Sequence, residues 1–198
     1  DLLWDDVSLT AVAIATPVMT HHALARQALL MGKHVFVEKP LAANTADALD
    51  LCLLAERKRR VLMVDHLLLF HPAVQELERV IASGELGDID YLYSSRTNLG
   101  IVRSEENVLW SLGPHDLSIM LHLTREGPVQ VVAQGGTYLQ VPLGIQDVVF
   151  VTLFFPGGQL GHLHLSWLDP GKVRKVTIVG SRKMAVFEIG RASCRESV

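Results

Sequence analysis

Three short apolar segments alternate with two longer segments in which apolar residues recur every three or four positions. The apolar segments are Ala11–Ala15, His34–Val37 and Val61–Val64, and a polar residue follows each of them. The continuous run Ala11–Ala15 is typical of a strand that is buried on both faces of a parallel sheet. The order strand, helix, strand, helix, strand, with short connections, predicts three parallel strands joined by right-handed crossovers.

The two intervening segments carry the signals of helix starts. Thr20 can cap a helix over residues 20–31, and Asn44 or Thr45 can cap a second helix over residues 44–59. One stripe of the second helix carries small side chains, and we expect it to be the packed one. Its members are Ala48, Cys52 and Ala55.

Beyond about residue 70 the pattern changes to mostly strands. A helix is expected from Pro72, with Val74, Leu77 and Ile81 on one face, and another is expected over 114–123. Strands are expected over 89–99, 129–138, 147–155, 160–167 and 173–179. The predicted fold class is therefore α/β, with a parallel sheet over residues 1–70 followed by an α+β part over 71–187 with a mostly antiparallel open sheet.

The composition is that of a globular protein without a nucleic-acid or membrane partner. The 198 residues are 49% hydrophobic and 20% charged, and 18 Lys and Arg against 21 Asp and Glu give a net charge of −3. No apolar run reaches the roughly 18–20 residues that cross a bilayer. Cys52 and Cys194 are too few for a disulfide framework, so we expect reduced thiols and a cytoplasmic protein.

Polar and proline residues follow the first two predicted strands. Thr16 and Pro17 follow the first strand, and Glu38, Lys39 and Pro40 follow the second. Ligands of open parallel sheets bind beyond the carboxyl ends of the strands. Pro40 restrains Lys39 to an extended backbone, which aims its side chain. A single lysine in such a place is more often an ordinary solvated residue, so the surrounding pattern has to decide.

That pattern resembles the signature of the Gfo/Idh/MocA oxidoreductases. The likeness covers 11–17, His21, 28–29 and 32–42, and continues at 109–116, 166–168 and 184–187. The family implies a Rossmann NAD(P)-binding domain followed by an α/β domain with an open sheet. It also implies hydride transfer between nicotinamide and a sugar or polyol hydroxyl carbon. The later segments look most like a branch associated with sugar-nucleotide pathways.

The resemblance implies roles for individual residues. The family's catalytic lysine maps to Lys39 and its catalytic histidine to His115, whereas we expect the neighbouring Asp116 to be structural. A lysine beside bound nicotinamide can relay the proton of a substrate hydroxyl, and a histidine can hydrogen-bond the same hydroxyl. The cofactor is expected to be NAD or NADP. Its expected contacts are Thr16, Pro17, His21, Glu38, Lys39 and Pro40.

The expected substrate contacts are His66, Ser111 and His115. Relatives of the inositol dehydrogenase type carry an aspartate four residues before the catalytic histidine, where this chain has Ser111. A hydroxyl cannot supply the charge of that carboxylate, so a sugar nucleotide is easier to accommodate than an inositol-like polyol. His162 and His164 lie on one face of a strand, but no third ligand of convincing spacing accompanies them, so we expect no metal site.

The G-x-G-x-x-G turn that holds the pyrophosphate in Rossmann domains does not occur in this sequence. By resemblance, residues 1–70 are the C-terminal half of the NAD(P)-binding domain, and 71–187 are an incomplete substrate domain. Residues 188–198 resemble the translated start of a common sequencing adapter, and we expect them to be an artefact. We therefore expect this fragment alone to bind NAD(H) negligibly and to be inactive.

Other functions of the same fold stay open. An NAD-dependent glycosidase oxidises and re-reduces its substrate, so it would release no net NADH. A non-catalytic, dinucleotide-binding regulatory protein would need no proton relay, and the presence of Lys39 and His115 argues against it. The expected partner is a sugar or sugar-nucleotide small molecule. Because dimers and tetramers that pair through the sheet face are common in the family, we also expect a homo-oligomer.

Overall fold

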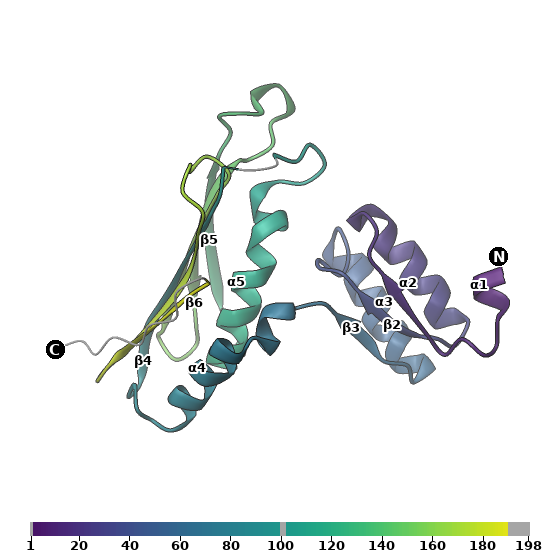
Figure 1. Ribbon diagram of the computed structural model, residues 1–198, viewed down its shortest axis with the longest axis horizontal. Coiled ribbons are helices and arrows are strands. Elements are labelled where there is room, and N and C mark those ends of the chain that lie inside the picture. The colour runs from purple at the N-terminus through teal and green to yellow at the C-terminus, as the bar shows by residue number, and fades with distance from the viewer. Residues whose placement is uncertain (1, 100–101, 190–198) are drawn as a thin grey trace. The chain divides into compact units, whose positions relative to one another are not determined.

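The computed structural model describes residues 2–99 and 102–189, which fold as two compact units (Figure 1). The division falls between His66 and Leu67, slightly before the boundary at residue 70 that was expected from the sequence. The short 3-10 helix η2 (Leu67–Phe70) accounts for the difference, because its Leu68 is buried in the core of the second unit.

The first unit is built on three short parallel strands. β1 (Ala11–Ile14), β2 (His34–Val37) and β3 (Leu62–Val64) pair in that order, which confirms the predicted sheet. The last residues of the three strands are register partners. The chain segments that follow the strands therefore begin side by side at one edge of the sheet.

The helical elements of this unit are α1 (Leu2–Asp5), the 3-10 turn η1 (Val18–Thr20), α2 (His21–Leu30) and α3 (Thr45–Lys58). Asn44 caps α3, because its side chain accepts a hydrogen bond from the backbone N–H of Asp47. Thr20 stands at the start of α2 as predicted. Its hydroxyl, however, donates to the carbonyl of Pro17 and makes no capping hydrogen bond.

One face of the three-stranded sheet is covered and the other is open. Helices α2 and α3 pack on the same face, where the buried side chains are Ile14, Ala25, Ala28, Leu29, Val35, Val37, Leu51, Leu54 and Ala55. The prediction that Ala11–Ala15 is buried on both faces is wrong, because the described helices leave the second face uncovered. On that face Ala13, Phe36 and Met63 form one exposed row across the three strands.

The packed stripe of α3 also differs from the prediction. Leu51, Leu54 and Ala55 are buried, whereas Cys52 is exposed as a free thiol. The spacing i, i+3, i+4 from Leu51 puts these three residues on one side of the helix and turns Cys52 away from it.

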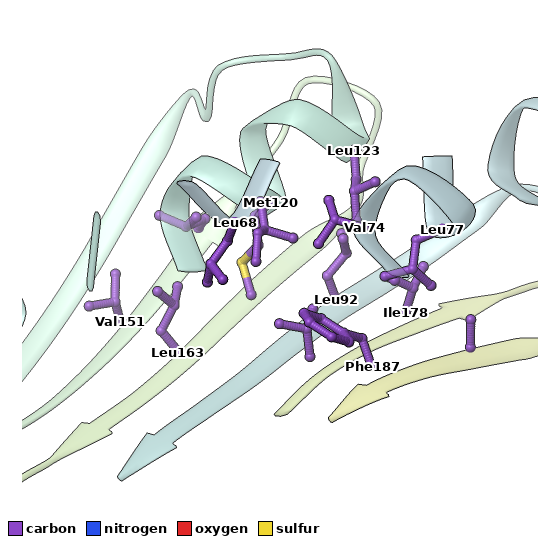
Figure 2. Close-up of a cluster of buried hydrophobic side chains, with 14 of the residues drawn as sticks. Leu68, Val74, Leu77, Leu92, Met120, Leu123, Val151, Leu163, Ile178 and Phe187 are labelled. Atoms are coloured by element: carbon purple, nitrogen blue, oxygen red, sulfur yellow. The ribbon is translucent and has the colours of Figure 1, made fainter. Parts of the chain in front are cut away.

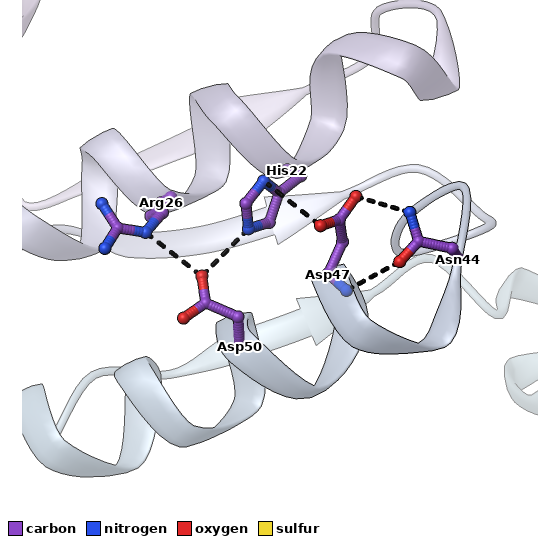
Figure 3. A network of polar contacts seen from close by, with 5 residues as sticks. All are labelled: His22, Arg26, Asn44, Asp47 and Asp50. Atoms are coloured by element: carbon purple, nitrogen blue, oxygen red, sulfur yellow. Dashed lines mark hydrogen bonds and ion pairs between the residues drawn. The ribbon is translucent and has the colours of Figure 1, made fainter.

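A network of polar side chains joins α2 to α3 at the surface (Figure 3). Asp50 lies 2.9 Å from Nε2 of His22 and accepts a 3.1 Å hydrogen bond from Nε of Arg26. The hydrogen bond from His22, assisted by the charge of Arg26, lowers the pKa of Asp50. These side chains are partly exposed to solvent, so we expect the network to add little to stability.

The second unit is built on a six-stranded sheet. Its strands are β4 (Ile89–Thr97), β5 (Gln130–Gly136), β6 (Val148–Phe154), β7 (Leu160–Ser166), β8 (Val173–Gly180) and β9 (Met184–Glu188), of which Figure 1 labels β4, β5 and β6. The order is β5-β6-β7-β4-β8-β9, and every neighbouring pair is antiparallel except β4 with β7. The mostly antiparallel open sheet predicted from the sequence is confirmed.

Helices cover one face of this sheet and bury its core (Figure 2). The covering helices are α4 (Pro72–Ala82) and α5 (Val108–Thr124). A separate 3-10 turn, η3 (Val141–Leu143), precedes β6. Helix α4 buries Val74 and Leu77 as predicted, but its third buried residue is Val80, and Ile81 is only partly buried.

Helix α5 begins at Val108 and not at Pro114 as predicted. Asn107 caps it by accepting a hydrogen bond from the backbone N–H of Trp110. Pro114 therefore lies inside the helix. The neighbouring Gly113 lies against β7, since an added Cβ would be 3.2 Å from Cδ1 of Leu165. The absence of a side chain at this position lets the helix approach the sheet.

A buried ion pair fastens α5 to the sheet. Arg96 of β4 donates to both carboxylate oxygens of Asp116, from Nε to Oδ2 and from Nη2 to Oδ1 at 3.1 Å. Arg96 is 5% exposed and Asp116 is fully buried. Burial raises the pKa of Asp116, while the charge of Arg96 opposes that rise. The structural role expected for Asp116 agrees with these contacts.

The expected artefact at 188–198 falls mostly outside the described residues. Glu188 is the last residue of β9, and the backbone N–H of Ile189 donates to the carbonyl of Arg174. Residues 190–198 lie outside the described part of the chain. No helix within residues 2–99 and 102–189 is long and apolar enough to cross a membrane.

We predict that Asp116→Asn lowers the free energy of unfolding by about 3–5 kcal/mol, because it leaves the Arg96 guanidinium buried without its counter-charge. Urea denaturation followed by tryptophan fluorescence measures the change. Asp50→Asn is the matched control, since it removes the same charge from an exposed pair and should change stability little. Equal losses in the two variants would contradict the importance of the buried pair.

Candidate active site

The carboxyl edge of the three-stranded sheet gathers the predicted residues of the first unit. Strand pairing continues just past the strands, because the N–H of Glu38 donates to the carbonyl of Ile14 at 2.9 Å. The N–H of Asp65 likewise donates to the carbonyl of Val37 at 2.8 Å. The segments that follow β1, β2 and β3 are thereby held next to one another.

The predicted cofactor contacts lie along this edge with different exposure. Thr16 and Pro17 are exposed after β1, whereas Glu38, Lys39 and Pro40 are half-buried after β2. The Thr16 hydroxyl lies 2.6 Å from that of Thr20, which ties the first segment to the start of α2. The Lys39–Pro40 peptide bond is cis.

His21 lies behind these two segments and is 1% exposed. Its Nδ1 lies 2.8 Å from the carbonyl oxygen of Pro40, and its Nε2 lies 2.8 Å from that of Thr16. The histidine at the start of α2 therefore contacts both strand-end segments through their backbones.

His66 follows β3 at the same edge and is half-buried. Its Nδ1 is buried and makes no hydrogen bond within the described residues. Burial lowers the pKa of His66, and the charge of Asp65 opposes that shift. A neutral imidazole with one buried nitrogen unused is chemically able to accept or donate a hydrogen bond to a ligand.

The remaining predicted residues, Ser111 and His115, lie on α5 in the second unit. Their spacing of four positions puts them on the same face of the helix, one turn apart. Ser111 is 7% exposed, and His115 is half-buried. The hydroxyl of Ser118 donates to the carbonyl of His115 at 2.9 Å. The structure thus groups the predicted residues in two sets, one in each unit.

Arg96, which holds α5 through Asp116, was not predicted from the sequence. The sequence does contain a signal for this arginine. Leu92, Ser94 and Arg96 occupy every second position of β4, so they lie on the face that packs against the helices. An arginine at a buried strand position requires a carboxylate partner. The buried Asp116 of α5 is that partner.

His162 and His164 lie on the open face of the second sheet. The ring of His164 stacks on Phe150 with centroids 4.7 Å apart, and Nδ1 of His162 lies 3.2 Å from the hydroxyl oxygen of Thr152. Within the described residues, no group of three or more His, Cys, Asp or Glu side chains could hold a metal ion.

The carboxyl edge of the first sheet is where the sequence predicts that NAD or NADP binds. Exposed Thr16 and Pro17 and half-buried Lys39 present surface where ligands of open parallel sheets bind. With Glu38 and Pro40, these residues would hold NAD or NADP at this edge. His21, being buried, presents almost no surface to a ligand.

Solved structures of oxidoreductases resemble this chain over most of its length. An inositol dehydrogenase homologue from Azotobacter vinelandii, complexed with NADH and myo-inositol, matches with a TM-score of 0.85 and 25% identity. That match covers 90% of this chain and 50% of the other. The UDP-N-acetylglucosamine 3-dehydrogenase of Acidithiobacillus ferrooxidans matches with a TM-score of 0.82 and 28% identity, covering 92% and 56%.

Sequence relatives point to the same group of proteins. The same Acidithiobacillus dehydrogenase is 36% identical over 126 residues, which are 63% of this chain and 39% of that protein. The 2,7-anhydro-N-acetylneuraminate hydratase of Escherichia coli is 28% identical over 177 residues, covering 82% and 47%. The matched part of the chain thus spans less than half the length of either relative.

Two family models match the chain in succession. One describes an oxidoreductase family with an NAD-binding Rossmann fold and matches residues 1–66, which form the first unit. The other describes the GFO/IDH/MocA C-terminal domain and matches residues 74–186 in the second unit. The resemblance seen in the sequence is confirmed, and the chain belongs to the GFO/IDH/MocA oxidoreductase family.

Proposed function

We propose that the complete protein is an NAD- or NADP-dependent oxidoreductase. It transfers a hydride between nicotinamide and a hydroxyl-bearing carbon of a sugar, polyol or sugar nucleotide. The observation that supports the proposal is that the segments carrying Thr16 and Lys39 leave paired strands at the same carboxyl edge of the parallel sheet. The relatives that are named dehydrogenases or reductases support the same reaction class.

The protein's own groups supply proton transfer in this scheme. Bound nicotinamide would accept the hydride, and the hydroxyl proton must leave its oxygen at the same stage. We assign that proton to the amine of Lys39, with His115 as the hydrogen-bonding partner of the substrate hydroxyl. Ser111 stands where inositol-dehydrogenase-like relatives have a carboxylate, which favours a sugar nucleotide as substrate.

A redox-neutral reaction is the second candidate, because one relative is named a hydratase and not a dehydrogenase. An enzyme of that kind, like the NAD-dependent glycosidases, would leave the cofactor unchanged after each turnover. Absorbance of NADH separates the two, since only a dehydrogenase accumulates it in proportion to the product.

We predict that Lys39→Ala in the complete protein lowers kcat by roughly 10²–10⁴-fold, the usual contribution of general acid–base catalysis. Cofactor affinity, set largely by the pyrophosphate-binding turn, should change little. Lys39→Arg should not restore activity, because a guanidinium stays protonated and cannot accept the proton. Steady-state kinetics and calorimetric titration with NADH measure both effects.

The exposed Lys58 near the end of α3 provides the control for this prediction. Lys58→Ala removes the same charge away from the strand ends and should leave kcat unaltered. A kcat for Lys39→Ala within about threefold of the parent value would contradict the assigned role.

We also propose that the protein is a cytoplasmic homo-oligomer that pairs through the open face of its six-stranded sheet. Large side chains are exposed there, with Tyr91, Tyr93, Phe150 and Leu160 each 36–43% accessible. Six strands of about seven residues span roughly 600 Å². That area approaches the about 800 Å² that each partner buries in a standard interface. A second copy brings the same face, which carries aromatic, aliphatic and imidazole side chains, and satisfies two-fold symmetry.

We predict that Tyr93→Lys dissociates this oligomer in the complete protein, because it places a charge at the centre of an apolar interface. Analytical ultracentrifugation measures the mass. Leu49→Lys on α3 is the control, since Leu49 is 56% exposed but lies outside the sheet face. A Tyr93→Lys variant that keeps the parent mass would refute the proposed interface.

A further inference from the structure

His21 occupies an unusual position for a polar residue. It is the first residue of α2, its side chain is 1% exposed, and its ring lies between the segments that follow β1 and β2. A buried imidazole needs hydrogen-bond partners to offset its desolvation. Here both partners are backbone carbonyl oxygens, one from each segment.

The two contacts use different ring nitrogens and different carbonyl oxygens, although each distance is 2.8 Å. A carbonyl oxygen can only accept, so each contact is a hydrogen bond only when the ring nitrogen that faces the carbonyl carries a proton. A ring with one N–H can make only one of these bonds at a time. The contribution of each contact can therefore be separated by replacing one donor at a time.

We infer that His21 is a positioning residue that holds the turn carrying Lys39 in place relative to the Thr16 segment. This inference rests on the proposed function, because it assigns the contact with Pro40 to placement of the proton-relaying amine. The contact with Thr16 is assigned to placement of the nicotinamide-binding segment. His21 acts through the backbone and not by touching the ligand.

The chemistry is sensitive to such placement. Shifting a catalytic group by about 1 Å can lower the rate by about 10²-fold, even when the substituted residue is remote from the reaction. Pro40 directly follows Lys39, so a displaced Pro40 carbonyl displaces the attachment of the amine. Glu38 restrains the other end of the turn through its backbone hydrogen bond to Ile14.

Three substitutions in the complete protein test the two contacts. His21→Leu removes both donors at similar volume and should lower kcat by about 10²-fold. His21→Asn places an amide near the Nδ1 position, so it should retain most of kcat while raising KM for the cofactor. His21→Gln places its amide near the Nε2 position, so it should lower kcat while leaving KM for the cofactor nearly unchanged. His22→Leu is the control, since the His22 ring pairs with Asp47 and Asp50 of α3.

Hydrogen exchange of the cofactor-free protein provides a readout that does not depend on activity. Amides of residues 36–41 should exchange roughly tenfold faster in His21→Leu than in the parent, because a buried hydrogen bond is lost. Residues 62–64 in β3 should be unaffected. Unchanged exchange in residues 36–41, or Asn and Gln variants with the same kcat and KM, would overturn the inference. A complete protein that reduces no nicotinamide would instead refute the proposed function, and the exchange result would still decide the role of His21.

Discussion

The candidate site depends on the parallel pairing of β1, β2 and β3. The last residues of the three strands are register partners, so the chain leaves the sheet three times at one edge. Two backbone hydrogen bonds beyond the strands keep the departing segments together. A register shift of one residue would reverse which side chains face the helices and would move Lys39 away from Thr16.

The second unit places its own candidate residues by a different interaction. Helix α5 is capped by Asn107, approaches β7 at Gly113 and is fastened to β4 by the pair of Arg96 with Asp116. Because Asp116 directly follows His115, the buried pair fixes the rotation of the helix at that point. The buried pair therefore restrains the helix turn that carries His115.

Much of this arrangement could be predicted from the sequence. Apolar periodicity located the four longer helices and every described strand except β9, because burial on one face imposes a regular spacing. The start of α5 could not be predicted in the same way. Pro114 suggested a first helical turn, whereas the cap at Asn107 extends the helix past it. The sequence predicted that Ala13 is buried, but it is exposed. The spacing of apolar residues along a strand does not tell whether another element covers that face.

The candidate residues were predicted by resemblance more than by local chemistry. Thr16, Lys39 and His115 stand in a recognisable pattern. The strands before Thr16 and Lys39 form where expected, whereas the helix of His115 begins six residues earlier than expected. The link from His21 to two carbonyls could not be predicted, because it joins residues that are distant in sequence through backbone atoms, which leave no trace in residue type. The partner of Asp116 was predictable in principle from the alternation along β4.

Transfer of deuterium tests the central claim of hydride transfer most directly. The complete protein would be incubated with NAD⁺ and either ring-deuterated UDP-N-acetylglucosamine or ring-deuterated myo-inositol, and the recovered cofactor would be analysed by mass spectrometry. The proposed function predicts that deuterium appears in NADH as the sugar is oxidised. Conversion of the sugar with an unlabelled cofactor, even within a single turnover, would contradict it.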